Sequence, residues 1–142
     1  MARRLAAPAP LFVYGTLQFP EVMQALILRV PPMQPVVVPG WQAAAMPPKV
    51  YPVLIQADQS QAAGHLLDDL NDQEWAVLDG FEDPMYELYS VQTTTGVQAW
   101  AYAGTTPPST DGPWDKDSFA SQHLAAYAER CQEIGKRLRA ID

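Results

Sequence analysis

Fourteen prolines divide this 142-residue chain into short segments. Proline lacks a backbone N–H and fixes its own φ angle, so it interrupts helices and is confined to the edges of sheets. The three longest segments without proline are residues 53–83, 85–106 and 114–142. We therefore expect any long helix to lie within residues 53–83 or 114–142.

Residues 11–14 form an apolar run that ends at Gly15, which predicts a buried strand followed by a glycine turn. Pro20 and Glu21 are typical of the first turn of a helix, where proline needs no N–H donor and a carboxylate is favoured. The apolar residues expected on one side of this helix are Val22, Met23, Leu26, Ile27 and Val30. The predicted order is therefore strand, turn and helix.

The next segment, residues 31–52, alternates prolines with short apolar pieces, a pattern that favours short edge strands and loops. Residues 53–55 and 62–67 predict two further strands, with residues 58–60 turning between them. Gly64 inside the second strand indicates a bulge or the close approach of another backbone.

A short helix is predicted after Asn71, because Asn71 and Glu74 form a variant of the capping box. Trp75 and Leu78 supply its inward face, and Gly80 predicts its end.

Strand-like residues 86–93 and 97–103 flank Thr94–Gly96 and predict a hairpin. After it, apolar residues recur at steps of three and four, which predicts one amphipathic helix from about Asp117. The residues on that stripe are Ala120, Leu124, Tyr127, Cys131, Ile134, Leu138 and Ile141.

These segments predict a single α+β domain over residues 11–142 with a small mixed, largely antiparallel sheet. Residues 1–10, rich in alanine and proline, are interpreted as a mobile tail.

The composition excludes several classes of function. One cysteine and two histidines provide neither a disulfide framework nor a zinc cluster, so no metal or cofactor is expected. A net charge of −7 argues against binding to a nucleic-acid backbone. The sequence has no apolar stretch of the length that a membrane span needs and no signal-peptide pattern, so we expect a cytoplasmic protein.

The histidines and the cysteine are interpreted mainly as structural residues. His65 lies in a predicted strand, His123 flanks the last helix, and Cys131 lies on its apolar stripe. A small buried thiol is more common at such a position than a reactive one.

Two features could carry chemistry. Glu82 follows Phe81 where a capped helix gives way to a strand, and a partly buried carboxylate there would suit a proton acceptor. The turn at Gly15, Thr16 and Leu17 could present successive backbone N–H groups to an anion. From these residues alone, a solvated carboxylate and a simple tight turn remain open alternatives.

Together these two features resemble a known family. Residues 12–17 read FVYGTL, and residues 78–83 read LDGFED about 60 residues later, followed by Tyr86. This pairing is similar to the gamma-glutamylcyclotransferase-like superfamily, and within it to the avirulence-induced-gene-like branch. The resemblance covers residues 11 to about 130.

The resemblance implies a sheet closed into a barrel-like core with surrounding helices and a cavity between the turn and the glutamate. It implies a metal-independent reaction in which the α-amine of a γ-glutamyl group attacks its own γ-carbonyl, giving 5-oxoproline and a free amine. The substrate would belong to glutathione or γ-glutamyl amine metabolism.

The same resemblance implies a role for each matching residue. Glu82 would be the general acid and base, and the backbone of Gly15, Thr16 and Leu17 would hold a carboxylate or the developing oxyanion. Tyr14, Tyr86 and Tyr102 would contact substrate, although simple core packing would explain these tyrosines equally well.

One departure concerns the substrate. Relatives commonly carry an arginine just after the tyrosine of the second motif, whereas Glu87 and Leu88 follow Tyr86 here. A binding module of the same fold without turnover is therefore the alternative function. The remaining expectations are a small γ-glutamyl substrate, no nucleic-acid or membrane partner, and a monomer or weak homodimer.

Overall fold

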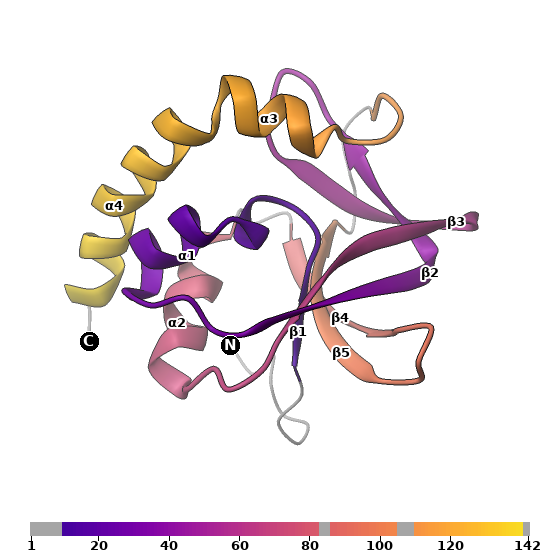
Figure 1. The fold of residues 1–142 in the computed structure, drawn as a ribbon, viewed down its shortest axis with the longest axis horizontal. Helices are drawn as coiled ribbons and strands as arrows, with labels where there is room; N and C mark the ends of the chain where they lie inside the picture. The colour runs from indigo at the N-terminus through magenta and orange to yellow at the C-terminus, as the bar shows by residue number, and fades with distance from the viewer. Residues whose placement is uncertain (1–9, 83–85, 105–109, 141–142) are drawn as a thin grey trace.

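The computed structural model describes residues 10–82, 86–104 and 110–140 (Figure 1). Its strands are β1 (Leu11–Val13), β2 (Met33–Ala45), β3 (Pro52–Leu67), β4 (Tyr86–Gln92) and β5 (Gln98–Gly104). Its helices are the 3₁₀ turn η1 (Thr16–Gln18), α1 (Pro20–Ile27), α2 (Asp72–Phe81), α3 (Lys116–Gln122) and α4 (Leu124–Ala140). Figure 1 shows α1, α2 and α4 gathered beside the sheet, with α3 and α4 forming an arch.

The strands form one mixed sheet in the order β2-β3-β1-β5-β4. The central strand β1 runs antiparallel to β3 and parallel to β5, and the outer pairs β2–β3 and β4–β5 are antiparallel. The predicted α+β class with a largely antiparallel mixed sheet is therefore confirmed.

The sheet is strongly curled, although its edge strands are not joined by a ladder. The backbone N–H of Thr94, just after β4, donates a hydrogen bond of 2.9 Å to the carbonyl of Val37 in β2. The rings of Trp41 and Tyr89 from the same two strands have centroids 5.9 Å apart. The core is thus barrel-like in shape, while the sheet itself stays open.

The predicted turn at residues 58–60 is wrong, because β3 is one continuous strand of 16 residues. Its partner β2 is also one strand rather than several short pieces. The pairing shifts between Pro39, opposite Gln61, and Trp41, opposite Gln56. The extra residues of β3 therefore form a bulge, and β2 tolerates its prolines because it lies at the edge of the sheet.

Gly64 confirms the expected close approach of two backbones. A Cβ atom there would lie 2.2 Å from the carbonyl oxygen of Val13, the residue before the Tyr14–Gly15 turn. The missing side chain allows β3 to pack tightly against β1 and fixes the end of β1.

The helices of the first half begin as predicted but end at different residues. Helix α1 has Pro20 in its first turn and stops at Leu28, whose φ angle is +65°. Val30 therefore lies beyond the helix and is exposed, contrary to its predicted place on the apolar side.

Helix α2 has both hydrogen bonds of the capping box between Asn71 and Glu74. It continues through Gly80 to Phe81, so Gly80 does not end it. Leu138 of α4 packs against this glycine, where a Cβ atom would lie 2.9 Å from the Leu138 Cδ2 atom.

The predicted single C-terminal helix is two helices, α3 and α4, which meet at His123. The backbone of His123 has a φ of −127°, outside the helical range, so the axis changes direction there. Ala120 is exposed, while Tyr127 and Cys131 are buried as the stripe predicts. Ile141 lies outside the described residues.

Helix α4 packs very closely on α1. A Cβ atom at Gly135 would lie 2.5 Å from the carbonyl oxygen of Ala25. Arg139 donates hydrogen bonds of 3.1 and 2.6 Å to the carbonyls of Ala25 and Leu26. These carbonyls lie in the last turn of α1, where a cation is favoured, so the rotation of α4 about its axis is fixed.

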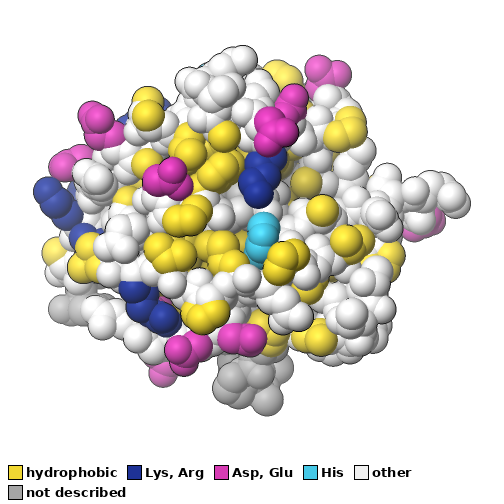
Figure 2. Space-filling view, viewed as in Figure 1, with side chains coloured by type: hydrophobic (Ala, Val, Ile, Leu, Met, Phe, Trp, Pro, Cys, Tyr) yellow, Lys and Arg dark blue, Asp and Glu magenta, His cyan; other side chains and the backbone are white. Residues whose placement is uncertain are grey.

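The described surface carries dispersed charge. On the face shown in Figure 2, lysine and arginine side chains are interspersed with acidic ones and do not gather into one basic patch. Among the described residues, no helix has the length and apolar character needed to cross a membrane.

Candidate functional site

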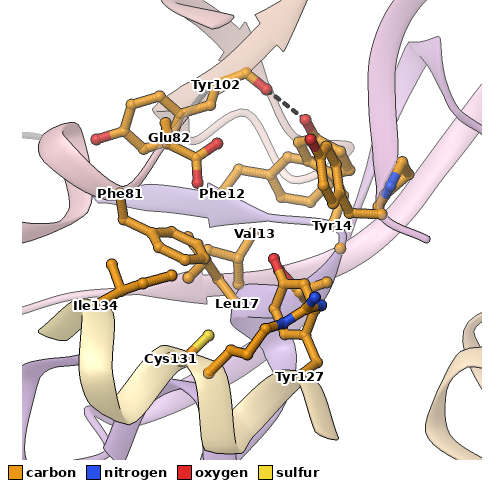
Figure 3. Close-up of a pocket in the computed structure, with 15 residues that line it drawn as sticks. Phe12, Val13, Tyr14, Leu17, Phe81, Glu82, Tyr102, Tyr127, Cys131 and Ile134 are labelled. Carbon is orange, nitrogen blue, oxygen red and sulfur yellow. Dashed lines mark hydrogen bonds between the residues drawn. The ribbon is translucent and has the colours of Figure 1, made fainter. Parts of the chain in front are cut away.

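A cavity of about 380 Å³ opens where β1, η1, the end of α2, β5 and α4 meet (Figure 3). Its volume is typical of sites that bind small molecules. Six of the seven residues predicted for the site line it, namely Tyr14, Gly15, Thr16, Leu17, Glu82 and Tyr102. The structure therefore brings the two separate sequence motifs to one place.

The turn after β1 is tightly constrained. A Cβ atom at Gly15 would lie 2.8 Å from Cγ of Pro52, so no larger residue fits without a shift. The backbone N–H and the side-chain amide of Gln18 both donate to the Gly15 carbonyl, at 3.1 and 3.3 Å. The first N–H groups of a helical turn have no partner within it, which makes the start of η1 suited to an anion.

Tyr14 and Tyr102 form a linked part of the wall. The Tyr14 hydroxyl donates a hydrogen bond of 2.6 Å to the backbone carbonyl of Tyr102. The hydroxyl of Tyr102 in turn donates a hydrogen bond to the carboxylate of Asp79. Burial, together with the nearby charge of Glu82, raises the pKa of Tyr14 well above its usual value. Tyr14 is therefore neutral near pH 7 and helps to position the wall.

Glu82 caps the C-terminal end of α2, and its N–H donates to the carbonyl of Leu78 at 3.1 Å. The residue is half-buried, and Figure 3 shows its carboxylate directed into the cavity. Its negative charge contributes to the raised pKa values of both Tyr14 and Tyr127. One carboxylate thus faces the Gly15–Leu17 turn across the cavity.

Sequence reasoning missed the contribution of α4, which lines the cavity with Tyr127, Arg130, Cys131 and Ile134. Three of these residues, Tyr127, Cys131 and Ile134, belong to the apolar stripe predicted for the last helix. The spacing of apolar residues correctly indicates one face of a helix, but it cannot distinguish a side chain that faces a core from one that faces a cavity.

Tyr127 and Arg130 lie close to the turn. The hydroxyl of Thr16 donates a hydrogen bond of 3.3 Å to the phenol oxygen of Tyr127, and burial raises the pKa of that phenol. The Arg130 guanidinium lies over the Tyr127 ring, 5.7 Å from its centroid. Among the described lining residues, Arg130 is the cation and Glu82 the anion.

The two histidines and Tyr86 are the remaining candidates, and the histidines do not line the described cavity wall. His65 in β3 shares a 3.0 Å hydrogen bond with Gln18, and His123 packs beside the Phe119 ring. The backbone of Tyr86 pairs with Gly104 at the start of β4, while its side chain lies outside the described part of the structure. The contact of Tyr86 with substrate therefore stays a prediction.

Burial raises the pKa of the Cys131 thiol to about 11, which fits an inert buried cysteine. Within the described ranges, no group of three or more histidine, cysteine, aspartate or glutamate side chains could hold a metal ion.

The curled mixed sheet with a glutamate facing a glycine turn across a cavity defines a class of small α+β proteins with a ligand-sized site. The chain belongs to the gamma-glutamyl cyclotransferase, AIG2-like family, whose model matches residues 11–118. The Arabidopsis thaliana AIG2-like protein D is 27% identical over 135 residues, covering 89% of each chain. AIG2-like protein C of the same plant is 33% identical over 116 residues, covering 77% of this chain and 67% of the relative.

Solved structures show the same fold. A solution structure from Arabidopsis thaliana matches with a TM-score of 0.67 at 22% identity, covering 91% of this chain and 84% of the other. A structure described as a gamma-glutamyl cyclotransferase matches with a TM-score of 0.56 at 14% identity, covering 94% and 88%. The predicted family and its fold are therefore confirmed.

Proposed function

We propose that this protein is a γ-glutamyl cyclotransferase-type enzyme that releases 5-oxoproline and a free amine from a small γ-glutamyl compound. The observation that carries the proposal is the shared cavity of Glu82 and the Gly15–Leu17 turn. A general acid and base must reach the same bound molecule as the groups that hold its charge, and this arrangement satisfies that condition.

In the proposed reaction, Glu82 accepts a proton from the substrate's α-ammonium group. The freed amine attacks the γ-carbonyl, and a ring C–N bond forms as the bond to the leaving amine breaks. Glu82 then returns this proton to the departing nitrogen. The attacking nitrogen loses a second proton as the ring amide forms, and Glu82 passes that proton to the released amine, which leaves as an ammonium ion, so protons and charge balance over the cycle. Attack within one molecule avoids the entropy cost of bringing two reactants together.

The opposite end of the cavity is suited to a carboxylate. The amides at the start of η1 are preorganised by the Gly15 turn, and preorganised N–H donors stabilise negative charge without reorganisation. Arg130, held over Tyr127 next to Thr16, adds a positive charge at the same end. We therefore assign the α-carboxylate of the γ-glutamyl group to this end.

The test is to incubate the protein with a panel of γ-glutamyl amines and γ-glutamyl amino acids and to assay 5-oxoproline. We expect product from at least one compound and a loss of about 100-fold or more in kcat for Glu82→Gln, as for removal of a general base. Glu87→Gln is the matched control, because Glu87 is an exposed carboxylate of β4 outside the described cavity wall.

A binding module of the same fold would behave differently. It would be stabilised by a γ-glutamyl compound in proportion to ligand concentration while 5-oxoproline stayed at background. That result with every compound would overturn the proposed reaction. A cytoplasmic location and a monomeric or weakly dimeric state also belong to this proposal, and sedimentation would test the latter.

A further inference from the structure

The cavity has two chemically distinct ends. Thr16, Tyr127 and Arg130 gather polar and charged groups at one end. Phe81, Cys131 and Ile134 line the cavity with apolar groups, and Figure 3 shows them grouped together on the side away from Tyr14. We call Cys131 and Ile134, with Phe81, the apolar wall.

Ile134 is a partly exposed member of this wall and is not among the residues that pack against the hydrophobic core. Two other partly exposed apolar residues of α4, Leu124 and Leu138, pack against the hydrophobic core. Ile134 instead borders the cavity, and Phe81 beside it is half-buried. Partly exposed apolar surface inside a cavity gains free energy when a ligand covers it.

The wall is held rigidly in place. Gly135 lies directly after Ile134 and contacts the backbone of α1 so closely that a Cβ atom would meet the Ala25 carbonyl at 2.5 Å. Arg139, one turn further on, bonds two carbonyls of α1. A site on a rigid element discriminates between ligands by shape better than one on a loop.

We propose that α4 selects the leaving amine, and that the preferred substrates are γ-glutamyl compounds whose amine part carries a branched aliphatic or aromatic side chain. This inference rests on the proposed function. When the glutamyl carboxylate occupies the polar end and the scissile amide lies near Glu82, the leaving group extends onto the apolar wall. The family's sequence model matches residues 11–118, and α4 lies after them. The proposed selectivity therefore depends on a part of the chain that the family match does not cover.

The experiment compares kcat/KM for γ-glutamyl-leucine and γ-glutamyl-glycine, which share the reacting groups and differ only in the side chain of the leaving amino acid. The wild-type protein is expected to favour the leucine compound by at least about tenfold, the range that apolar contacts provide. Ile134→Ala is expected to reduce this ratio by about fivefold or more. The leucine side chain of the substrate would then lose most of the apolar surface that it contacts on α4.

Leu124→Ala is the matched control. Leu124 is partly exposed on the same helix and contacts the core, so the substitution truncates a similar side chain away from the cavity. It should leave the leucine-to-glycine ratio unchanged. If Ile134→Ala does not fold, as judged by circular dichroism, Ile134→Val provides a smaller reduction of the same ratio.

Failure of this inference can be distinguished from failure of the proposed function. Turnover of both compounds with a ratio near one, or a ratio that Ile134→Ala leaves unchanged, would overturn the apolar wall while the reaction stands. If neither compound reacts, titration calorimetry measures their binding to the wild-type protein. Tighter binding of the leucine compound that Ile134→Ala abolishes would then support the wall, and equal binding would overturn it.

Discussion

The hydroxyl of Thr16 donates a hydrogen bond of 3.3 Å to the phenol oxygen of Tyr127, a residue 111 positions later in the chain. This bond joins the turn after β1 to helix α4, and both residues are buried. The two sides of the cavity are therefore coupled through a polar contact in a largely apolar region, where an unpaired hydroxyl is costly.

We predict that Tyr127→Phe destabilises the protein by about 0.5–1.5 kcal/mol, because the Thr16 hydroxyl loses its acceptor. Chemical denaturation measures the change, and Thr16→Val with the double variant completes a double-mutant cycle. A coupling energy near zero would show that the contact contributes nothing to the link between the turn and α4.

The Gly15 turn gives a second prediction. Gly15→Ala places a Cβ atom 2.8 Å from the ring of Pro52 and should destabilise the fold by about 1–3 kcal/mol. We also expect a loss of 5-oxoproline formation, since the amides of η1 move with the turn. Gly80→Ala is the comparison, because its new methyl group meets the movable end of Leu138 and alanine favours the helix. Equal destabilisation by the two substitutions would contradict this prediction.

Acid should weaken the link between Arg29, just after α1, and Glu74 in the first turn of α2. The hydrogen bond from Arg29 lowers the pKa of Glu74 below 4.5, and the Asn71 backbone N–H contributes in the same direction. A carboxyl group whose pKa is lower in the folded state stabilises the protein above its ordinary pKa, and this contribution is lost as the pH falls through the folded value. Urea unfolding at pH 7 and at about pH 3 measures the change.

Glu74→Gln should lose part of that pH dependence and be destabilised at pH 7. Glu133→Gln is the control, since Glu133 forms a pair with Lys136 in which both side chains are mostly exposed. Exposed pairs of this kind contribute little to stability. An identical pH dependence in the Glu74 variant and the wild type would overturn the prediction.

Cys131 should resist alkylation in the folded protein. With a pKa of about 11, roughly one thiol in ten thousand is ionised at pH 7, and only the thiolate reacts. Mass spectrometry after iodoacetamide treatment should show the native protein unmodified and the urea-unfolded protein fully modified. Rapid modification of the native protein would show that the thiol is reached through the cavity.

Features set by neighbouring residues could be predicted from the sequence. The capping box at Asn71 and Glu74, the hairpin at residues 94–96 and the glycine turn after β1 all have the structure that their local chemistry favours. In each case the hydrogen bonds that decide the conformation link residues within a few positions of one another.

Features set by distant partners could not be predicted in the same way. Residues 58–60 have the composition of a turn, yet β2 pairs with both flanking halves of β3 and keeps them in one strand. The apolar stripe continues through His123 without showing that α3 and α4 change direction there. Tyr127 and Cys131 of the stripe are buried as predicted, whereas Ala120 is exposed, and the cavity that α4 borders depends on where Gly135 docks on α1.

The contacts of Arg139 with Ala25 and Leu26 also affect the order of events during synthesis. These residues are more than 110 positions apart, so at roughly 5–20 residues per second the last turn of α1 waits about 6–23 seconds for its partner. Until α4 has been made, the core residues that pack with Tyr127 and Cys131 lack this part of their apolar cover. Transiently exposed apolar surface favours aggregation, so we expect the fold to be completed only once α4 is available to pack on α1.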